Sequence, residues 1–141
     1  MINKQIVDVR SSRFRTLTTS YYRGAHGVFV LFDCTSRESF HQVLQNFEEF
    51  NRAGNENIQK ILVATKIDLI DQRQVSYEEA KELADQLGVP YIETSSKNNI
   101  NVKEAVQILT RTVESNIERR NADLPVEPTV PTRHTWRCTV L

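Results

Sequence analysis

Short apolar runs alternate with amphipathic stretches along this chain from Gly24 onward. The first run, residues 27–33 with the sequence G-V-F-V-L-F-D, is apolar at successive positions, as in a strand that is buried on both faces. Two further runs, 60–65 and 90–94, have the length and the β-branched residues of strands. Because strands that alternate with helices form parallel sheets, the pattern predicts an α/β fold with helices flanking a parallel sheet.

Three helical stretches follow these strands. The first is predicted to begin with a capping box of Thr35 and Glu38, the second with one of Ser76 and Glu79, and the third at Asn101. The apolar positions that recur at helical spacing are Phe40, Val43, Leu44, Phe47 and Phe50 in the first helix, Ala80, Leu83, Ala84 and Leu87 in the second, and Val102, Ala105, Val106, Leu109 and Val113 in the third.

Length and composition narrow the class of protein. The chain has 141 residues, which suits one domain, and beyond about residue 120 it is proline-rich and without periodicity, as in a flexible linker. Its 18 Lys and Arg balance its 18 Asp and Glu, which argues against a nucleic-acid partner, since phosphate binding needs a basic surplus. The three histidines are scattered singly and there are two cysteines, so we expect neither a metal site nor a disulfide framework.

Polar residues follow the second and third predicted strands at their carboxyl ends, where ligands bind in open α/β sheets. These are Thr65-Lys66-Ile67-Asp68 and the segment 93–97 with the sequence E-T-S-S-K, whose Ser95 is 27 residues beyond Asp68. A carboxylate such as Asp68 accepts hydrogen bonds from both N1–H and N2–H₂ of guanine, which adenine does not offer. An amide of the loop 95–97 would donate to guanine O6, while the stem of Lys66 lies against the ring. Taken singly, T-K-I-D is more typical of a solvated loop after a strand, and its occurrence together with the second loop is what favours a guanine contact.

This pair of motifs resembles the base-recognition motifs of the Ras-superfamily GTPases. Residues 13–25, R-F-R-T-L-T-T-S-Y-Y-R-G-A, are similar to the end of the switch II segment of the Rab family, so the chain resembles a Rab-type small GTPase. The alternative for the tyrosines is that they are core aromatics of a short helix. For Thr65, which replaces the more usual asparagine, a base contact and a purely structural role stay equally open. The resemblance implies guanine-binding residues Thr65, Lys66, Asp68, Ser95, Ser96 and Lys97, and an effector surface of Phe14, Leu17 and Tyr21.

The chain ends with Cys138-Thr139-Val140-Leu141, a C-a-a-X pattern whose terminal leucine favours geranylgeranyl addition to Cys138. With the resemblance, this implies a cytoplasmic protein attached peripherally to the cytosolic face of endomembranes. Its expected partners are Rab effectors and the escort or carrier proteins that deliver the lipidated chain. One lipid with few basic neighbours makes the attachment reversible.

The sequence also departs from the family pattern. No G-x-x-x-x-G-K-[ST] string occurs, and in the register set by Phe14 the glycine and glutamine of the family's D-T-A-G-Q segment are Arg10 and Ser11. We therefore assign no catalytic residue, expect GTP or GDP to bind weakly or not at all, and expect Mg²⁺ only in the full-length family. The predicted organisation is a non-matching segment 1–12, a partial small-GTPase domain 13–119 and a flexible tail 120–141.

Two hypotheses follow for the function. The first is a Rab-like, guanine-nucleotide-dependent regulator of vesicle traffic, and the second is a truncated, non-hydrolysing isoform or gene fragment with effector-binding and lipid-anchoring ability. The family's strand order is 2-3-1-4-5-6, so the loss of the first strands would leave the strand at 27–33 as an open edge. Such an edge promotes aggregation, and we expect poor solubility of the isolated chain.

Overall fold

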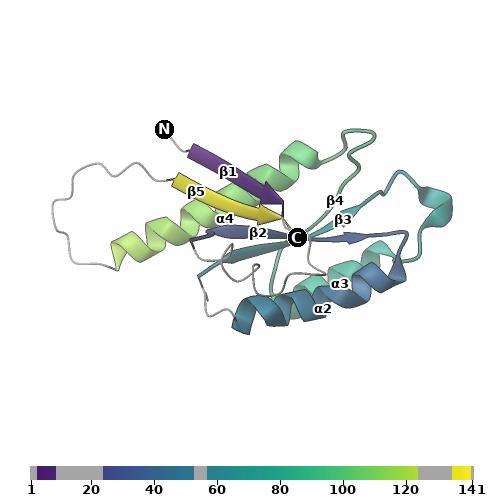
Figure 1. Ribbon diagram of the computed structural model, residues 1–141, viewed down its shortest axis with the longest axis horizontal. Coiled ribbons are helices and arrows are strands. Elements are labelled where there is room, and N and C mark those ends of the chain that lie inside the picture. The colour runs from purple at the N-terminus through teal and green to yellow at the C-terminus, as the bar shows by residue number, and fades with distance from the viewer. Residues whose placement is uncertain (1–2, 9–23, 53–56, 124–134, 141) are drawn as a thin grey trace.

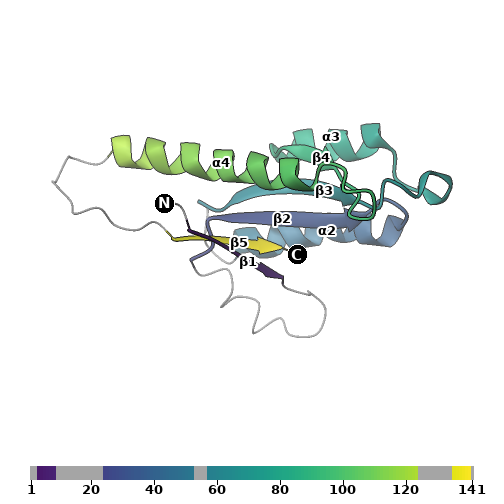
Figure 2. The same cartoon turned by 90° about the horizontal axis from the view of Figure 1, so that it is seen from above.

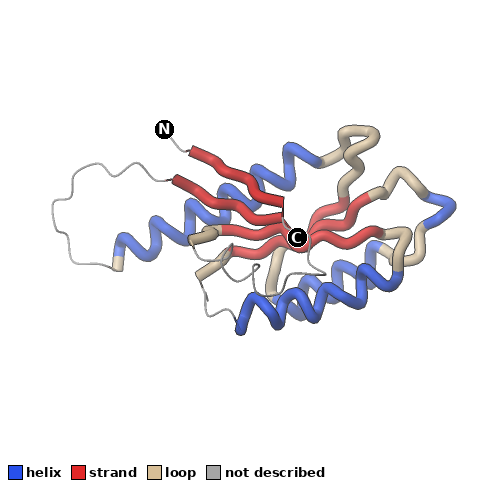
Figure 3. Tube along the Cα trace, in the orientation of Figure 1, coloured by secondary structure: helices blue, strands red, loops and turns tan. Residues whose placement is uncertain are grey.

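The computed structural model describes residues 3–8, 24–52, 57–123 and 135–140. In this part of the chain a five-stranded sheet has the order β1-β5-β2-β3-β4, and all its strand pairs are parallel (Figures 1 and 3). The predicted α/β fold, a partial P-loop-GTPase-like parallel sheet with flanking helices, is confirmed. The strands are β1 (Asn3–Asp8), β2 (Gly27–Asp33), β3 (Gln59–Thr65), β4 (Tyr91–Glu93) and β5 (Thr135–Val140).

Helices cover both faces of the sheet. Buried side chains of α2 and α3 pack with Val28, Val30 and Phe32 of β2, whereas those of α4 pack with Phe29 of the same strand. This alternation explains why β2 reads as a continuous apolar run: successive side chains point to opposite faces and both are covered. Figure 2 shows α4 lying alongside the strands. The helices are α2 (Arg37–Arg52), the 3₁₀ turn η1 (Ile70–Gln72), α3 (Tyr77–Leu87) and α4 (Val102–Ala122).

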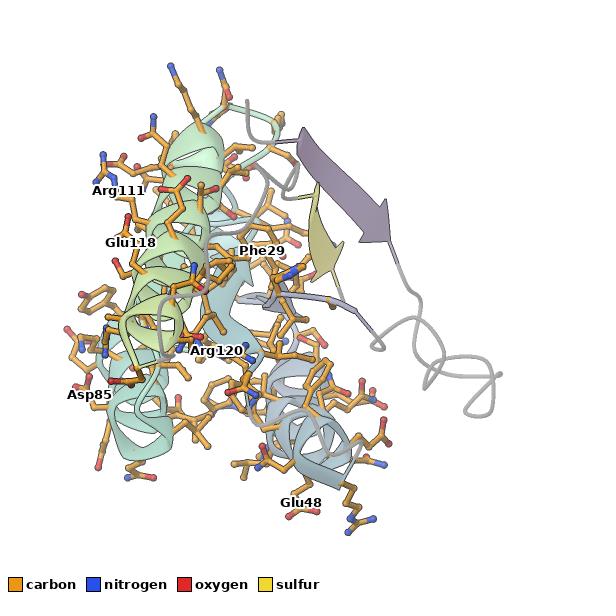
Figure 4. The ribbon with its side chains drawn as sticks, turned by 90° about the vertical axis from the view of Figure 1, so that its left-hand side faces the viewer. Phe29, Glu48, Asp85, Arg111, Glu118 and Arg120 are labelled. Atoms are coloured by element: carbon orange, nitrogen blue, oxygen red, sulfur yellow. The ribbon has the colours of Figure 1, made fainter. Side chains whose placement is uncertain are left out.

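The outer face of α4 is polar, as its amphipathic pattern requires. In Figure 4, Phe29 lies between β2 and α4, whereas Arg111 and Glu118 point away from the sheet. Leu109 and Val113, on the inner face of the helix, are 2% and 6% exposed. The hydrophobic burial that fixes α4 on the sheet therefore comes from one stripe of the helix.

Gly27, at the start of β2, lets α4 approach the sheet closely. A Cβ atom at this position would lie 3.0 Å from Leu109 Cγ and Cδ1 and from Val113 Cγ2. We predict that Gly27→Ala lowers the free energy of unfolding by about 1–2 kcal/mol through overpacking, measured by urea denaturation. Gln59→Ala, at the residue paired with Gly27 on β3, serves as the control and should change the stability far less. If Gly27→Ala were as stable as wild type, the Leu109 and Val113 side chains of α4 could move to accommodate the added methyl group without a measurable cost.

The helix boundaries follow the capping signals with one correction. Ser76 caps α3, since its Oγ accepts a hydrogen bond from Glu79 N–H at 3.2 Å, and Gly88 ends the helix in the left-handed conformation. The box predicted for Thr35 was wrong: the Thr35 hydroxyl donates to Asp33 Oδ1 at 2.6 Å, and Ser36 Oγ accepts from Ser39 N–H instead. The cap lies one residue later because Thr35 is engaged with the end of β2.

Leu44 differs from its predicted place in the core. It lies on the helix stripe predicted to be buried, but 49% of its surface is exposed, whereas Val43 beside it is fully buried. Leu44 borders a shallow pocket of about 260 Å³ between α2 and α3, which Phe40 and Leu83 also line. The buried stripe of α2 is therefore narrower than the sequence pattern indicated.

The two ends of the chain differ most from the sequence prediction. Residues 3–8 form β1, α4 extends to Ala122, and residues 135–140 of the predicted flexible tail form β5. β5 pairs with β2 over Gly27–Phe29, so the prediction that β2 is an open edge was wrong for this part of the strand. The expectation of poor solubility rested on that edge and loses its basis there.

Candidate functional site

The loops that follow β3 and β4 meet at the carboxyl edge of the sheet. Ser95 Oγ donates a hydrogen bond to Asp68 Oδ1 at 2.6 Å, across 27 residues of sequence. Two backbone bonds hold the loops together beside this contact, from Thr94 N–H to the Ala64 carbonyl at 2.8 Å and from Ile67 N–H to the Thr94 carbonyl at 3.3 Å. The structure thus places two of the predicted site residues in direct contact.

The loop after β4 is closed by its own backbone. Ser95 N–H donates to the Ile100 carbonyl at 3.1 Å, and Ile100 N–H donates back to the Ser95 carbonyl at 2.8 Å. Ser95 is fully buried, and its Oγ also accepts from Asn98 N–H at 3.2 Å. Ser96 and Lys97, at the tip, are exposed, and within the described residues their amides make no hydrogen bond. The loop therefore presents two available N–H donors next to the Asp68 carboxylate.

Lys66 is held by an acidic residue that sequence reasoning did not assign to the site. Its Nζ lies 2.5 Å from Asp33 Oδ2, and its backbone is in the left-handed region with φ of 62°. Burial alone would raise the pKa of Asp33, but the hydrogen bonds from Lys66 and Thr35 outweigh burial and hold this pKa below its ordinary value. The hydrogen bond to Asp33 in turn raises the pKa of Lys66. The ammonium group is thereby anchored beside β2, and the methylene stem spans the gap between the two strand ends.

Thr65 is used structurally. Its hydroxyl donates to the Phe32 carbonyl at 3.0 Å and ties the end of β3 to the end of β2. This bond fits the structural alternative for Thr65, and a hydroxyl oxygen keeps acceptor capacity for a second contact.

Glu93, at the end of β4, is joined to the loop after β3 by an ion pair. Arg73 donates to both carboxylate oxygens of Glu93, at 3.2 Å to Oε2 and by a shorter bond to Oε1, and the Tyr91 hydroxyl donates to Oε1 at 2.8 Å. The Arg73 and Glu93 side chains are 25% and 16% exposed. Burial alone would raise the pKa of Glu93, but the bonds from Arg73 and Tyr91 lower it overall. Burial, and then the bond to Glu93, raise the pKa of Tyr91.

The lowered pKa values of Glu93 and Asp33 predict acid sensitivity. Their ordinary values are 4.5 and 3.8, so as the pH falls the unfolded chain binds protons before the folded chain does. The stabilisation that each ionised carboxylate gives the fold is complete above its ordinary pKa and is lost as the pH falls through its lowered pKa in the folded chain. We expect the free energy of unfolding, from urea titrations between pH 7 and pH 3, to decline below about pH 4.5. The free energy of unfolding of Glu93→Gln should decline less steeply over this pH range. An equally steep decline would exclude Glu93 as a cause of the acid sensitivity.

Sequence reasoning missed Asp33 and Arg73 as parts of the site. Asp33 ends the apolar run of β2, and its place beside the end of β3 was a usable signal, because neighbouring parallel strands end at the same edge. Arg73 carried no such signal: it follows η1 in a loop, and only the tertiary fold brings it to Glu93.

Other predicted residues lie beyond what the structure describes. Phe14, Leu17 and Tyr21 fall outside the described residues. Cys138 lies in β5, where the strand pairing is described but the side chain is not. In the described part of the chain no helix is long and apolar enough to cross a membrane, and no group of three or more potential metal ligands gathers.

Comparison with known proteins identifies relatives of the chain. The Ras family model matches residues 2–115, which includes most of the segment 1–12 that was predicted not to match the family. Ras-related proteins RABD2c and RABD2b from Arabidopsis thaliana are each 46% identical over 133 residues, covering 94% of this chain and 66% of the relative. Ras-related protein RIC1 from Oryza sativa subsp. japonica is 46% identical over 125 residues, covering 88% and 60%. The chain therefore spans less than two-thirds of the length of these relatives.

Proposed function

Since this chain belongs to the Ras family and to its Rab branch, we propose that it binds guanine nucleotides at the carboxyl edge of the sheet. The binding residues are Lys66, Asp68 and the loop 95–97, with Thr65 at their edge. In the cell it acts as a Rab-like small GTPase, a guanine-nucleotide-dependent regulator of vesicle-mediated membrane traffic.

The observation that carries the proposal is the hydrogen bond between Ser95 Oγ and Asp68 Oδ1. It fixes the position of a carboxylate, which accepts only, next to the amides of Ser96 and Lys97, which donate only and are not engaged by any group in the described part of the chain. Guanine has the matching edge: N1–H and N2–H₂ donate to Asp68, and O6 accepts from an amide. Adenine offers an acceptor at N1 and a donor at N6, so both contacts would fail.

Lys66 and Thr65 complete the base site in this proposal. The pairing of the Lys66 ammonium with Asp33 leaves its methylene stem to cover one face of the purine ring. The Thr65 hydroxyl donates its hydrogen bond to the Phe32 carbonyl, so it can only accept a hydrogen bond from the ligand.

The sequence at the positions that bind the nucleotide phosphates in the family favours a second candidate function. No G-x-x-x-x-G-K-[ST] string occurs in the 141 residues, and Arg10 and Ser11 stand where the family has glycine and glutamine. On this alternative the chain binds the base without hydrolysing GTP and serves as an effector-binding, lipid-anchored protein. Release of inorganic phosphate from GTP and Mg²⁺ above the level of an Asp68→Ala control would exclude it.

Selectivity between bases tests the proposed function. We expect NMR titration of the chain to give measurable, saturable shifts with GDP at the amides of residues 66–68 and 95–98. ADP at the same concentration should give none, because its base has the wrong donor pattern. Equal shifts with GDP and ADP would indicate phosphate contacts alone and would overturn the base site.

Membrane attachment and partners belong to the same proposal. A geranylgeranyl group on Cys138 would hold the chain on the cytosolic face of endomembranes, and Rab effectors would contact Phe14, Leu17 and Tyr21. Escort and carrier proteins would handle the lipidated form. The C-a-a-X pattern and the residues that match the Rab switch II segment support this part of the proposal.

A further inference from the structure

The C-terminal segment lies inside the sheet. β5 is parallel to β1 over six residue pairs, from Asn3↔Thr135 to Asp8↔Val140, and on its other side it is parallel to β2 over three pairs, Gly27↔Cys138 to Phe29↔Val140. Figure 1 shows β5 in yellow between β1 in purple and β2. The last strand of the chain thus occupies an interior position of the sheet.

β5 also connects β1 to the rest of the fold. Among the described strands, β5 is the one that pairs with β1, which is the outer strand of the sheet. Withdrawal of β5 would detach β1 and expose the backbone groups of Gly27–Phe29, in a strand whose Val28 and Phe29 side chains are buried in the core. The insertion of β5 is therefore a substantial and cooperative contact that involves strands from both ends of the chain.

Cys138 lies within this strand, with Ile6 of β1 and Gly27 of β2 as its Cα partners. An enzyme that alkylates a C-terminal cysteine must bind the last residues as a separate extended peptide. In that reaction the Cys138 thiolate attacks C1 of an isoprenoid diphosphate, a C–S bond forms, the C–O bond breaks, diphosphate leaves and the thiol proton passes to solvent. A strand hydrogen-bonded on both sides cannot enter a second binding site at the same time.

We propose that the C-terminal segment is a reversible closing strand, and that its insertion between β1 and β2 and the lipidation of Cys138 exclude one another. The second half rests on the lipidation included in the proposed function. In the inserted state the cysteine is protected. In the released state it is accessible to a modifying enzyme.

Cysteine cross-linking tests the insertion on its own. In a Cys34→Ala background, Ile6→Cys places a second thiol opposite Cys138 on the neighbouring strand, where Cα atoms lie about 4.8 Å apart, within disulfide range. Mild oxidation should cross-link this variant at least about ten times faster than Lys4→Cys, whose partner is Trp136, two residues away. Equal rates for the two variants would overturn the insertion.

The exclusion is tested by geranylgeranyl transfer from geranylgeranyl diphosphate, with a transferase that accepts C-a-a-Leu sequences. A free peptide of residues 124–141 gives the unprotected rate, and the full chain should react at least about ten times more slowly. Gln5→Pro/Ile6→Pro should restore the rate, since consecutive strand residues direct their N–H groups to opposite sides and one proline must remove a bond to β5. Gln5→Thr/Ile6→Val keeps these donors and should remain slow.

The outcomes separate the two claims. If the peptide is not modified, the proposed lipidation of Cys138 is wrong, and so is the claim that insertion and lipidation exclude one another. The cross-linking experiment still tests the insertion of β5. If the full chain reacts at the peptide rate while Ile6→Cys cross-links normally, insertion does not protect Cys138 and the exclusion is wrong. A slow full chain that the proline pair accelerates and the Gln5→Thr/Ile6→Val pair does not supports the proposal.

Discussion

Replacement of Asp68 by asparagine is expected to weaken GDP binding about 10–100-fold and to improve the binding of xanthosine diphosphate. In the proposed site the carboxylate accepts from both N1–H and N2–H₂ of guanine, whereas an asparagine amide would direct its NH₂ group at the guanine NH₂ group. Xanthine has a carbonyl at that position, so it can accept from the amide while its N1–H donates to the amide oxygen. The Ser95 hydroxyl, which donates to Asp68 Oδ1 in the wild type, keeps an acceptor in the amide oxygen of the variant, and the loop contact is therefore preserved.

The matched control for this prediction is Asp71→Asn, which removes the same charge from the exposed η1 turn three residues further on. Calorimetric titration of wild type and both variants with GDP, xanthosine diphosphate and ADP would separate the effects. Asp71→Asn should behave as wild type with all three ligands. If Asp68→Asn weakened every ligand equally, or changed none, the carboxylate would not contact the base.

The pattern of apolar residues was sufficient for the central part of the fold. β2 begins and ends at the residues predicted, Gly27 and Asp33, because both faces of this strand are covered and nothing interrupts its apolar run. The meeting of the two loops was also predictable, since the carboxyl ends of parallel neighbours lie at one edge. Here the local sequence and the tertiary fold favour the same structure.

The misplaced features depend on one local contact and on one pairing between distant segments. Thr35 has the composition of a cap, but Asp33 binds its hydroxyl and its amide, so the next serine takes the capping role. The segment 135–140 is rich in threonine, tryptophan and valine, which is a strand signal, yet the prolines before it suggested a linker. Its pairing with β1, more than 120 residues away in sequence, could not be derived from either segment alone.

The proposed base site and the stability of the fold share one interaction. Glu93 ends β4 immediately before the loop that carries Ser95, and Arg73 reaches it from the loop that follows Asp68. Arg73 Nε also donates to the Val75 carbonyl at 2.6 Å, which fixes the guanidinium in place. Because the ion pair spans the same two loops as the bond between Ser95 and Asp68, it helps to hold them in the arrangement that the proposed base site requires.

Arg73→Ala is therefore expected to lower the free energy of unfolding by about 2–3 kcal/mol and to weaken GDP binding as well. The loss is large because Glu93, only 16% exposed, would keep its charge without a cationic partner, and the Tyr91 hydroxyl alone would satisfy it. The pKa of Glu93 should rise as a result, so the variant should lose less stability than wild type between pH 6 and pH 3.

Urea denaturation at pH 7 measures the stability change, and Arg52→Ala provides the control. Arg52 pairs with Glu48 at 3.5 Å, but these side chains are 79% and 67% exposed, so its loss should cost less than about 0.5 kcal/mol. If Arg73→Ala and Arg52→Ala had equal effects, solvent would screen both pairs alike, and the two base loops would have to be held together by Ser95 and the backbone bonds alone.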